Sequence, residues 1–216
     1  MKNRVVTAAA ILVACVIFGL GVGIYTSRLQ QNPVAPPSIQ GLLWPNPRTL
    51  QNFTLVDQHN RNFTLTNLRG KWSFLFFGYT HCPDICPVTL SVMNHVYQQL
   101  QKHGESGNVQ MIFISVDPKR DTPDVISSYV SYFNRDFIGL TGDDHQLESL
   151  TGQMGIVHKT EPETAPGEYL VDHSAAILLI SPGGQWVGLF SAPQQADDVV
   201  QRFRSIRDFI TNQSRS

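Results

Sequence analysis

The first hydrophobic pattern along the chain is an uninterrupted apolar segment near its start. Val5 to Ile24 reads VVTAAAILVACVIFGLGVGI and contains no charged residue. About 20 such residues span the hydrocarbon core of a bilayer. Lys2 and Arg4 precede the segment and only Arg28 follows closely, and positive charge favours the cytoplasmic side of a membrane. The pattern therefore predicts a transmembrane anchor over residues 5–24, with residues 1–4 in the cytoplasm and the bulk of the chain outside.

Two other interpretations of this segment stay open. A cleaved signal peptide usually has a shorter apolar core of roughly 7–15 residues and ends in a clear Ala-x-Ala pattern, which this segment lacks. A lipoprotein signal, lipidated on Cys15, is suggested by Leu12-Val13-Ala14-Cys15, but the apolar segment continues to Leu20, where a mature lipoprotein would turn polar. No Arg-rich transit peptide precedes it. We therefore expect a single-pass protein of a bacterial cytoplasmic membrane, with its C-terminal domain on the outer, periplasmic side.

Residues 25–47 change to a composition rich in Pro, Gln and Asn, with few periodic apolar positions. Such proline content favours an extended, semi-stiff spacer. Residues 42–44 are apolar and are candidates for packing on the following domain. We expect a linker over residues 25–47 and one folded domain over residues 48–216.

Within this domain, apolar positions follow first the period of strands and then that of helices. The predicted elements are a β-hairpin over 53–65, a buried strand at 72–77, a helix from 87 to about 104, a strand at 109–116, a helix opened by 122–124, a short strand at 137–140, a short helix at 145–152, a strand at 174–180, its antiparallel partner at 186–190 and an amphipathic helix over 199–210. This order predicts an α/β fold, a thioredoxin-like α/β/α sandwich with an N-terminal β-hairpin, preceded by one transmembrane helix.

Composition excludes several classes of function. The chain has 16 Lys and Arg against 17 Asp and Glu, a formal net charge of −1, so no basic excess indicates nucleic-acid binding. Its 12 Phe, 6 Tyr and 3 Trp supply a core, so the low charge content of 15% does not indicate disorder. The 3 cysteines cannot all pair, which argues against a disulfide-stapled scaffold.

The most informative motif is the segment between the predicted buried strand and the helix after it, GYTHCPDICP at residues 78–87. Because proline clashes with the carbonyl four residues back in a helix interior, we expect the helix to begin at Pro87, with Cys86 near its N-cap. A helix N-terminus stabilises a thiolate and lowers its pKa. Cys82 and Cys86 can therefore hold one soft metal ion, such as Cu(I) or zinc, or close a disulfide. A structural disulfide or two inert thiols are the alternatives.

A third ligand is expected from the 7 histidines. His173 stands out, because YLVDHS leads directly into a predicted buried strand, and in a thioredoxin-like fold the loop before that strand faces the active-site helix. Thiol exchangers of this fold usually place a cis-proline there. Asp172 can orient the His173 ring by bonding the ring nitrogen that does not bind the metal. The alternative is that His173 is a purely structural histidine. His158 is expected in a loop, and the ring of His81 is not expected to reach the same point, although whether it or a water completes a Cu(II) shell stays open.

Two carboxylates in VDPKRDTP, residues 116–123, also invite a metal-binding interpretation. Asp117 and Asp121 lie just before Thr122-Pro123-Asp124, which has an N-cap residue, a proline at the first helical position and an acid in the first turn. We therefore expect this segment to shape a loop and cap the following helix.

Together, GYTHCPDICP, VDPKRDTP and YLVDHS make the chain resemble the Sco/SenC family of membrane-anchored copper proteins, over essentially its whole length. The resemblance implies a thioredoxin-like fold and a copper ion, Cu(I) or Cu(II), held by Cys82, Cys86 and His173. It also implies assistance in assembling the binuclear copper centre of cytochrome c oxidase, on subunit II, outside the membrane. Family members are discussed as thiol–disulfide reductases as well.

Two functions therefore compete, with metal binding favoured over enzyme activity. The first is a copper metallochaperone, whose cysteines must stay reduced and so need an upstream thiol reductant or copper donor in an oxidising compartment. The second is a membrane-anchored thiol–disulfide oxidoreductase, or a peroxidase of the same fold, in which Cys82 and Cys86 cycle through a disulfide. A structural zinc site is a third option.

Overall fold

The computed structural model describes residues 17–21, 37–39 and 42–213. The chain divides into two units, residues 1–36 and 37–216. In the first unit the described residues are helical. Most of the predicted anchor, Val5–Ile24, lies outside the described residues, and no described helix has the length and apolar character needed to cross a membrane. The transmembrane anchor stays a prediction.

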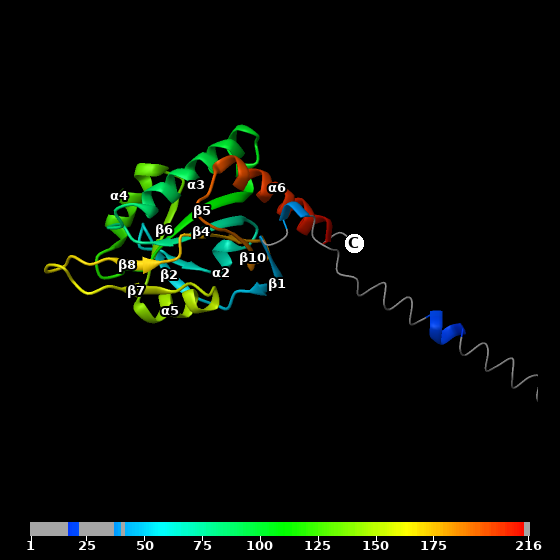
Figure 1. The fold of residues 1–216 in the computed structure, drawn as a ribbon, viewed down its shortest axis with the longest axis horizontal. Coiled ribbons are helices and arrows are strands. Elements are labelled where there is room, and N and C mark those ends of the chain that lie inside the picture. The colour runs from blue at the N-terminus through cyan, green and yellow to red at the C-terminus, as the bar shows by residue number, and fades with distance from the viewer. Residues whose placement is uncertain (1–16, 22–36, 40–41, 214–216) are drawn as a thin grey trace, which may run out of the picture. The chain divides into compact units, whose positions relative to one another are not determined.

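The second unit is built on a mixed β-sheet (Figure 1). Within the described residues this sheet has eight strands, in the spatial order β1 (Leu43–Thr49), β10 (Gln185–Phe190), β9 (Ile177–Ile180), β4 (Trp72–Gly78), β5 (Val109–Ser115), β6 (Ile138–Thr141), β2 (Thr54–Asp57) and β3 (Asn62–Thr64). The pairs β4–β5 and β5–β6 are parallel, and the other pairs are antiparallel. A separate antiparallel pair joins β7 (His158–Thr160) to β8 (Val171–His173).

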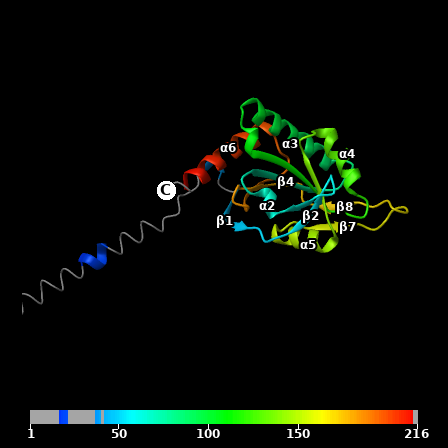
Figure 2. The same cartoon turned by 180° about the vertical axis from the view of Figure 1, so that it is seen from behind.

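Helices cover the sheet. The described α-helices of the second unit are α2 (Leu65–Leu68), α3 (Ile85–Lys102), α4 (Pro123–Phe133), α5 (Asp144–Gln153) and α6 (Ala196–Gln213). Short 3-10 helices occur at η1 (Pro37–Ile39) and η2 (Ser106–Asn108). Figures 1 and 2 show α3, α4 and α6 on one face of the sheet and α5 toward the other. Parallel strands need such crossover connections, which α3 and α4 supply here.

The core gathers around β4. All seven of its residues are buried, as expected for a near-continuous apolar strand with helices on both faces. On the α6 side, the Phe203 ring lies with its centroid 5.6 Å from that of Trp72 and 5.0 Å from that of Phe74. These aromatic contacts hold α6 against the central strands.

Most predicted elements are present near their expected positions. The N-terminal hairpin is confirmed, with β2 and β3 paired antiparallel, and so are the two parallel central strands. The helix opened by Thr122 is confirmed as well, because the Thr122 side chain accepts a hydrogen bond from the backbone N–H of Val125.

The predicted strand at 174–180 begins later than expected. Pairing in the main sheet starts only at Ile177, whereas Val171–His173 pairs with β7 instead. The chain therefore changes partner just after His173. The sequence does not indicate β1 or β7, because their pairing depends on partners distant along the chain: β1 pairs with β10 at the sheet edge.

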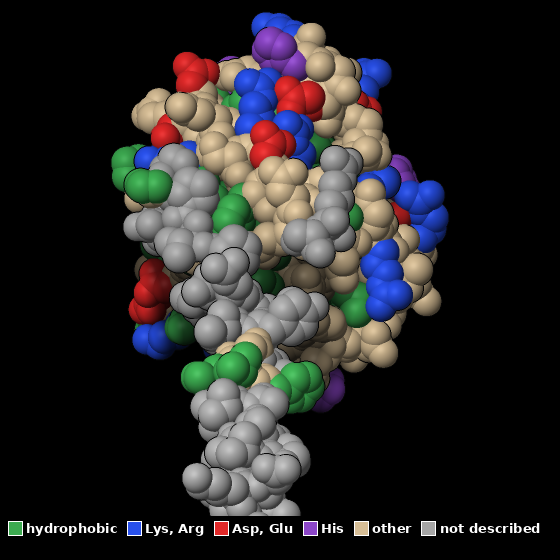
Figure 3. Space-filling view, turned by 90° about the vertical axis from the view of Figure 1, so that its right-hand side faces the viewer, with side chains coloured by type: hydrophobic (Ala, Val, Ile, Leu, Met, Phe, Trp, Pro, Cys, Tyr) green, Lys and Arg blue, Asp and Glu red, His purple; other side chains and the backbone are tan. Residues whose placement is uncertain are grey.

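Charges on the second unit are interspersed rather than sorted by sign. On the face seen in Figure 3, acidic and basic side chains alternate among polar ones. Glu105, for example, bonds both Arg204 and Arg207 of α6. This mixture agrees with the formal net charge of −1.

The contacts of Phe203 predict a large effect on stability. The ring is fully buried, so Phe203→Ala should lower the free energy of unfolding by about 3–5 kcal/mol, because it leaves a cavity against Trp72 and Phe74. Thermal unfolding followed by circular dichroism measures the loss. Tyr132→Ala is the control, since Tyr132 is 85% exposed, and an equal loss in both variants would contradict the role given to Phe203.

Candidate metal centre

The two cysteines lie where the central strand passes into α3. β4 ends at Gly78, and α3 begins at Ile85 after Asp84 as its N-cap. The expectation that the helix begins at Pro87 is therefore wrong, and Cys86 lies inside the first turn rather than near the cap. Pro87 is tolerated in the first turn for two reasons. A backbone N–H there has no hydrogen-bond partner within the helix, so none is lost. The proline ring also has no helical carbonyl four residues back with which to clash.

The structure brings the three predicted ligands together. The Sγ atoms of Cys82 and Cys86 and a ring nitrogen of His173 all lie within 4.8 Å of one another. The Cys86 Sγ lies 3.2 Å from the His173 Nε2. Cys86 is fully buried, whereas Cys82 keeps 9% of its surface exposed. Of the three groups, Cys86 thus forms the floor of the site, and Cys82 is the thiol nearer to solvent.

The orientation of the His173 ring follows from its neighbours. Nδ1 lies 3.1 Å from the backbone carbonyl oxygen of Ser174, and because that oxygen only accepts, Nδ1 carries the proton. The lone pair is then on Nε2, which faces Cys86. Edge-on contacts with Phe76 and Tyr79, at centroid distances of 5.9 and 5.7 Å, hold the ring in place.

Asp172 does not orient this ring, contrary to expectation. It is exposed and pairs across the β7–β8 ladder with Lys159, which is also exposed. Adjacent residues of a strand point to opposite faces, so Asp172 faces solvent while His173 faces the cysteines. The carbonyl of Ser174 takes the role expected of the carboxylate.

The two thiols differ in acidity because they share a hydrogen bond. Donation from the Cys86 thiol outweighs the opposing effect of burial and lowers the pKa of Cys82 to about 3. The same hydrogen bond, together with burial, raises the pKa of Cys86. The metal-free reduced pair therefore holds one negative charge, located on the more exposed sulfur, and a soft cation is attracted to that sulfur first.

Gly78 leaves the space that Cys86 occupies. A Cβ atom at this position would lie 2.7 Å from the Cys86 Sγ and 3.0 Å from a ring carbon of Phe113. The close approach of strand and sulfur thus requires a residue without a side chain. This explains why the cysteine motif begins with glycine at the end of the strand.

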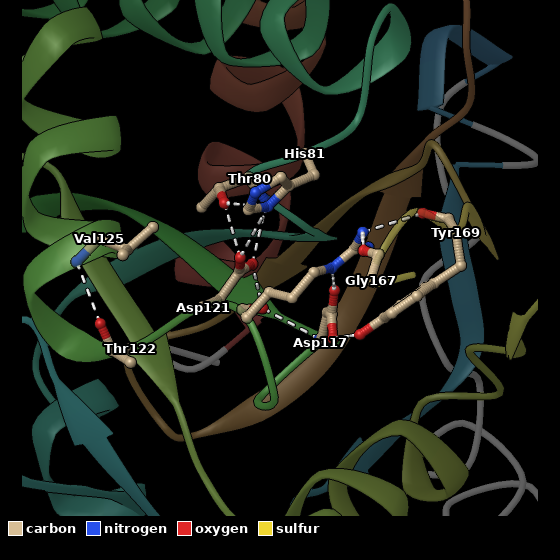
Figure 4. A network of polar contacts seen from close by, with 10 residues as sticks. Thr80, His81, Asp117, Asp121, Thr122, Val125, Gly167 and Tyr169 are labelled. Carbon is tan, nitrogen blue, oxygen red and sulfur yellow. Dashed lines mark hydrogen bonds and ion pairs between the residues drawn. The ribbon is translucent and has the colours of Figure 1, made fainter. Parts of the chain in front are cut away.

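A buried carboxylate fastens the loop that carries Cys82 (Figure 4). Asp121 is fully buried and accepts hydrogen bonds from the backbone N–H of Thr80 at 2.9 Å, from the Thr80 hydroxyl at 2.6 Å and from the Ser115 hydroxyl at 2.6 Å. A buried charge is tolerated only when it is paired or hydrogen-bonded in this way. The expectation that this segment shapes a loop and caps the following helix is confirmed.

A second carboxylate fastens the hairpin that carries His173. Asp117 is bonded by Arg120 at 2.5 Å and by the Tyr169 hydroxyl at 2.7 Å. The Arg120 guanidinium stacks 3.5 Å above the Tyr169 ring and donates to the Tyr169 carbonyl. Burial and the bond to Asp117 raise the pKa of Tyr169 to about 12, so the phenol stays a donor at neutral pH.

Sequence reasoning missed Thr80 and Tyr169 as supports of the site. Both lie inside the motifs that it singled out, but their partners, Asp121 and Asp117, come from a different motif. His158 lies in β7 rather than in a loop and pairs across the ladder with His173. Neither His158 nor His81 belongs to the converging group among the described residues.

The chemistry of this donor set is restricted. Two thiolates and one neutral imidazole are soft or borderline ligands, which suit Cu(I) and zinc and disfavour magnesium or calcium. The same two cysteines are free in the described structure, so disulfide formation is the other reaction open to them.

Comparison with known proteins agrees with this geometry. A model of the SCO1/SenC family matches residues 44–208. An SCO2-like protein of Rickettsia prowazekii is 30% identical over 207 residues, which cover 95% of this chain and all of that one.

Two solved structures resemble the fold closely. The copper-bound ScoI of Arabidopsis thaliana has a TM-score of 0.68 at 34% identity, covering 73% of this chain and 98% of that one. The copper-bound ScoI of Bradyrhizobium japonicum has a TM-score of 0.65 at 35% identity, covering 72% and 98%. These likenesses confirm the predicted thioredoxin-like α/β fold. On the extent of the family match and the identity over nearly its full length, the chain belongs to the SCO1/SenC family.

Proposed function

We propose that this chain is a copper metallochaperone that binds one copper ion through Cys82, Cys86 and His173 and delivers it to a partner. The observation that carries the proposal is the convergence of two thiols and an imidazole nitrogen within 4.8 Å. The copper-bound structures of the two ScoI relatives support copper as the metal.

The donor set favours copper over zinc. A structural zinc site is almost always closed by four protein ligands, whereas only three groups converge among the described residues. Cu(I) is satisfied by two thiolates and an imidazole, and Cu(II) needs a further ligand. A site with three donors therefore binds copper while leaving room for a ligand of the recipient.

Delivery requires that the ion be held and yet be reachable. Cys86 is fully buried, whereas Cys82 keeps 9% of its surface exposed and His173 is half-buried. A recipient thiolate or imidazole can thus approach the ion from the Cys82 side and displace the ligands in turn. The hydrogen bonds of Asp121 and Asp117 hold the two ligand-bearing loops during this exchange, so the site does not need to reorganise first.

The proposed setting follows the resemblance described above. The domain is anchored by residues 5–24 to a bacterial cytoplasmic membrane and lies on its outer side, where it supplies copper to subunit II of cytochrome c oxidase. Because thiols tend to oxidise there, an upstream reductant or copper donor keeps Cys82 and Cys86 ready to bind.

One observation favours thiol–disulfide exchange as a second function. The pKa of Cys82 is lowered to about 3 and that of Cys86 is raised, a division of charge that suits an attacking thiolate beside a resolving thiol. His173 argues for metal binding instead, because its Nε2 faces the buried sulfur, where an exchanger needs no ligand.

Substitution of the three ligands tests copper binding directly. In anaerobic titration of the reduced protein with Cu(I) against a competing chelator, the wild type should bind one equivalent. Cys82→Ala, Cys86→Ala and His173→Ala should each weaken binding by roughly 10- to 100-fold or more, since loss of even an outer partner of a metal ligand has an effect of that size.

His158→Ala is the matched control for His173→Ala, because the two histidines are cross-strand neighbours on the same hairpin and only one belongs to the converging group. Unchanged Cu(I) affinity in His173→Ala, or equal losses in both histidine variants, would remove the three-ligand site.

The pH dependence of alkylation tests the division of charge between the thiols. With the pKa of Cys82 lowered to about 3, its thiolate is present at pH 5, where an ordinary cysteine with a pKa of about 8.5 is protonated. Iodoacetamide should therefore modify Cys82 of the reduced, copper-free protein at pH 5, as followed by mass spectrometry.

In Cys86→Ala the main cause of this lowering is gone, so the pKa of Cys82 should rise and the rate at pH 5 should fall by at least about tenfold. If Cys82 of the wild type reacts only above about pH 8, the shared-proton arrangement is wrong.

A further inference from the structure

A second histidine adjoins the site along the chain without belonging to the converging group among the described residues. His81 directly precedes Cys82, the more exposed of the two thiols. Its side chain is 52% exposed, whereas the half-buried His173 makes edge contacts with the Phe76 and Tyr79 rings. His81 is therefore accessible to an incoming ion or partner, although it does not help to enclose the three-ligand group.

The hydrogen bonds around His81 determine which ring nitrogen is free. The Thr80 hydroxyl donates its single proton to Asp121 at 2.6 Å. Nδ1 of His81 lies 3.1 Å from that hydroxyl oxygen, which is left able only to accept, so Nδ1 must be the donor. The neutral ring then carries its lone pair on Nε2. His173 has the same tautomer for a parallel reason, because its Nδ1 bonds the Ser174 carbonyl.

The chain of contacts from Asp121 through Thr80 to His81 also fixes the direction of the ring (Figure 4). Asp121 is fully buried and cannot move without losing three hydrogen bonds. Its Oδ1 lies 3.7 Å from the His81 Nδ1, so the carboxylate favours the inward position of that nitrogen. Histidines that bind metals are held in the same way, with the non-ligating nitrogen donating toward a carboxylate or other acceptor.

We propose that His81 is a capture ligand: the Nε2 of its exposed ring accepts copper from the donor and passes it to the neighbouring residue Cys82. The proposal rests on the proposed function and adds a step to it. Imidazole nitrogen suits copper in either oxidation state. A ligand that is not part of the final three-ligand group increases the rate of copper uptake without increasing the final affinity.

The transfer is a ligand exchange with no change of oxidation state. The bond from copper to the donor breaks as the bond to the His81 Nε2 forms. The bond to Nε2 then breaks as the ion bonds the thiolate sulfur of Cys82, the adjacent residue. Binding of Cys86 and His173 completes the site, and the thiol proton of Cys86 leaves to solvent.

Two variants of His81 separate capture from a structural role. His81→Ala removes both ring nitrogens. His81→Asn places an amide N–H where Nδ1 donates to Thr80, but has no atom in place of Nε2. If His81 only supports the Asp121 network, asparagine should therefore preserve the uptake of copper. If His81 is a capture ligand, asparagine should not preserve it. His103→Ala is the control, since His103 is exposed at the far end of α3.

The experiment mixes the reduced full-length protein anaerobically with the Cu(I) complex of bathocuproine disulfonate in a stopped-flow instrument. Loss of the absorbance of the complex gives the uptake rate, and the end point gives the affinity. We expect His81→Ala and His81→Asn to take up copper roughly tenfold more slowly, with affinity and stoichiometry unchanged and His103→Ala equal to the wild type.

Three outcomes would overturn the proposal. A wild-type rate in His81→Asn would show that the residue only supports the loop. A loss of affinity as large as the loss of rate would make His81 a ligand of the final site. Failure of the wild type to take up copper would overturn the proposed function together with the capture step, and so is distinguishable from failure of the capture step alone.

Discussion

The buried carboxylate of Asp121 is the constraint on which the arrangement of the site depends. Its side chain is fully buried. Removing a carboxylate from water is unfavourable unless hydrogen bonds within the protein replace those to water. The replacements come from two places: Ser115 ends β5, and Thr80 lies in the loop before the cysteines. If the Cys82 loop moves away, the charge loses its Thr80 partners, so this loop is held to the end of β5.

The second ligand-bearing segment is held by the same means. Tyr169 and Arg120 both bond Asp117, and this contact ties the β7–β8 hairpin to the loop that contains Asp121. His173 ends that hairpin. The loop of residues 116–123 thus supports both ligand-bearing segments. Asp121 positions the segment with the cysteines, and Asp117 positions the segment with His173. Preorganisation of this kind lets two segments that are distant in the sequence present three ligand atoms to one ion.

The structure also shows why the cysteines are not equivalent. Gly78 permits the Cys86 sulfur to lie against the strand, where burial disfavours its thiolate, and the Cys86 thiol then donates to Cys82. The charge therefore lies on the exposed side of the pair. An ion that approaches from solvent meets the thiolate of Cys82, which follows His81 in the chain, before it meets the fully buried Cys86. This order of contact fits a protein that both receives and releases its metal.

Local sequence determined the parts of this protein whose physics is local. The apolar segment at 72–77 required a buried strand, Thr122-Pro123-Asp124 required a helix start, and the pair Cys82 and Cys86 required soft-metal or disulfide chemistry. His173 was identified through resemblance and its place before a strand. The tertiary structure alone decided that Ser174 rather than Asp172 orients that ring, that Asp121 bonds Thr80, and that Asp117 bonds Tyr169. The reason is physical: periodicity and capping act between residues a few positions apart, whereas a buried charge takes its partners from whichever segments the fold brings within hydrogen-bond distance.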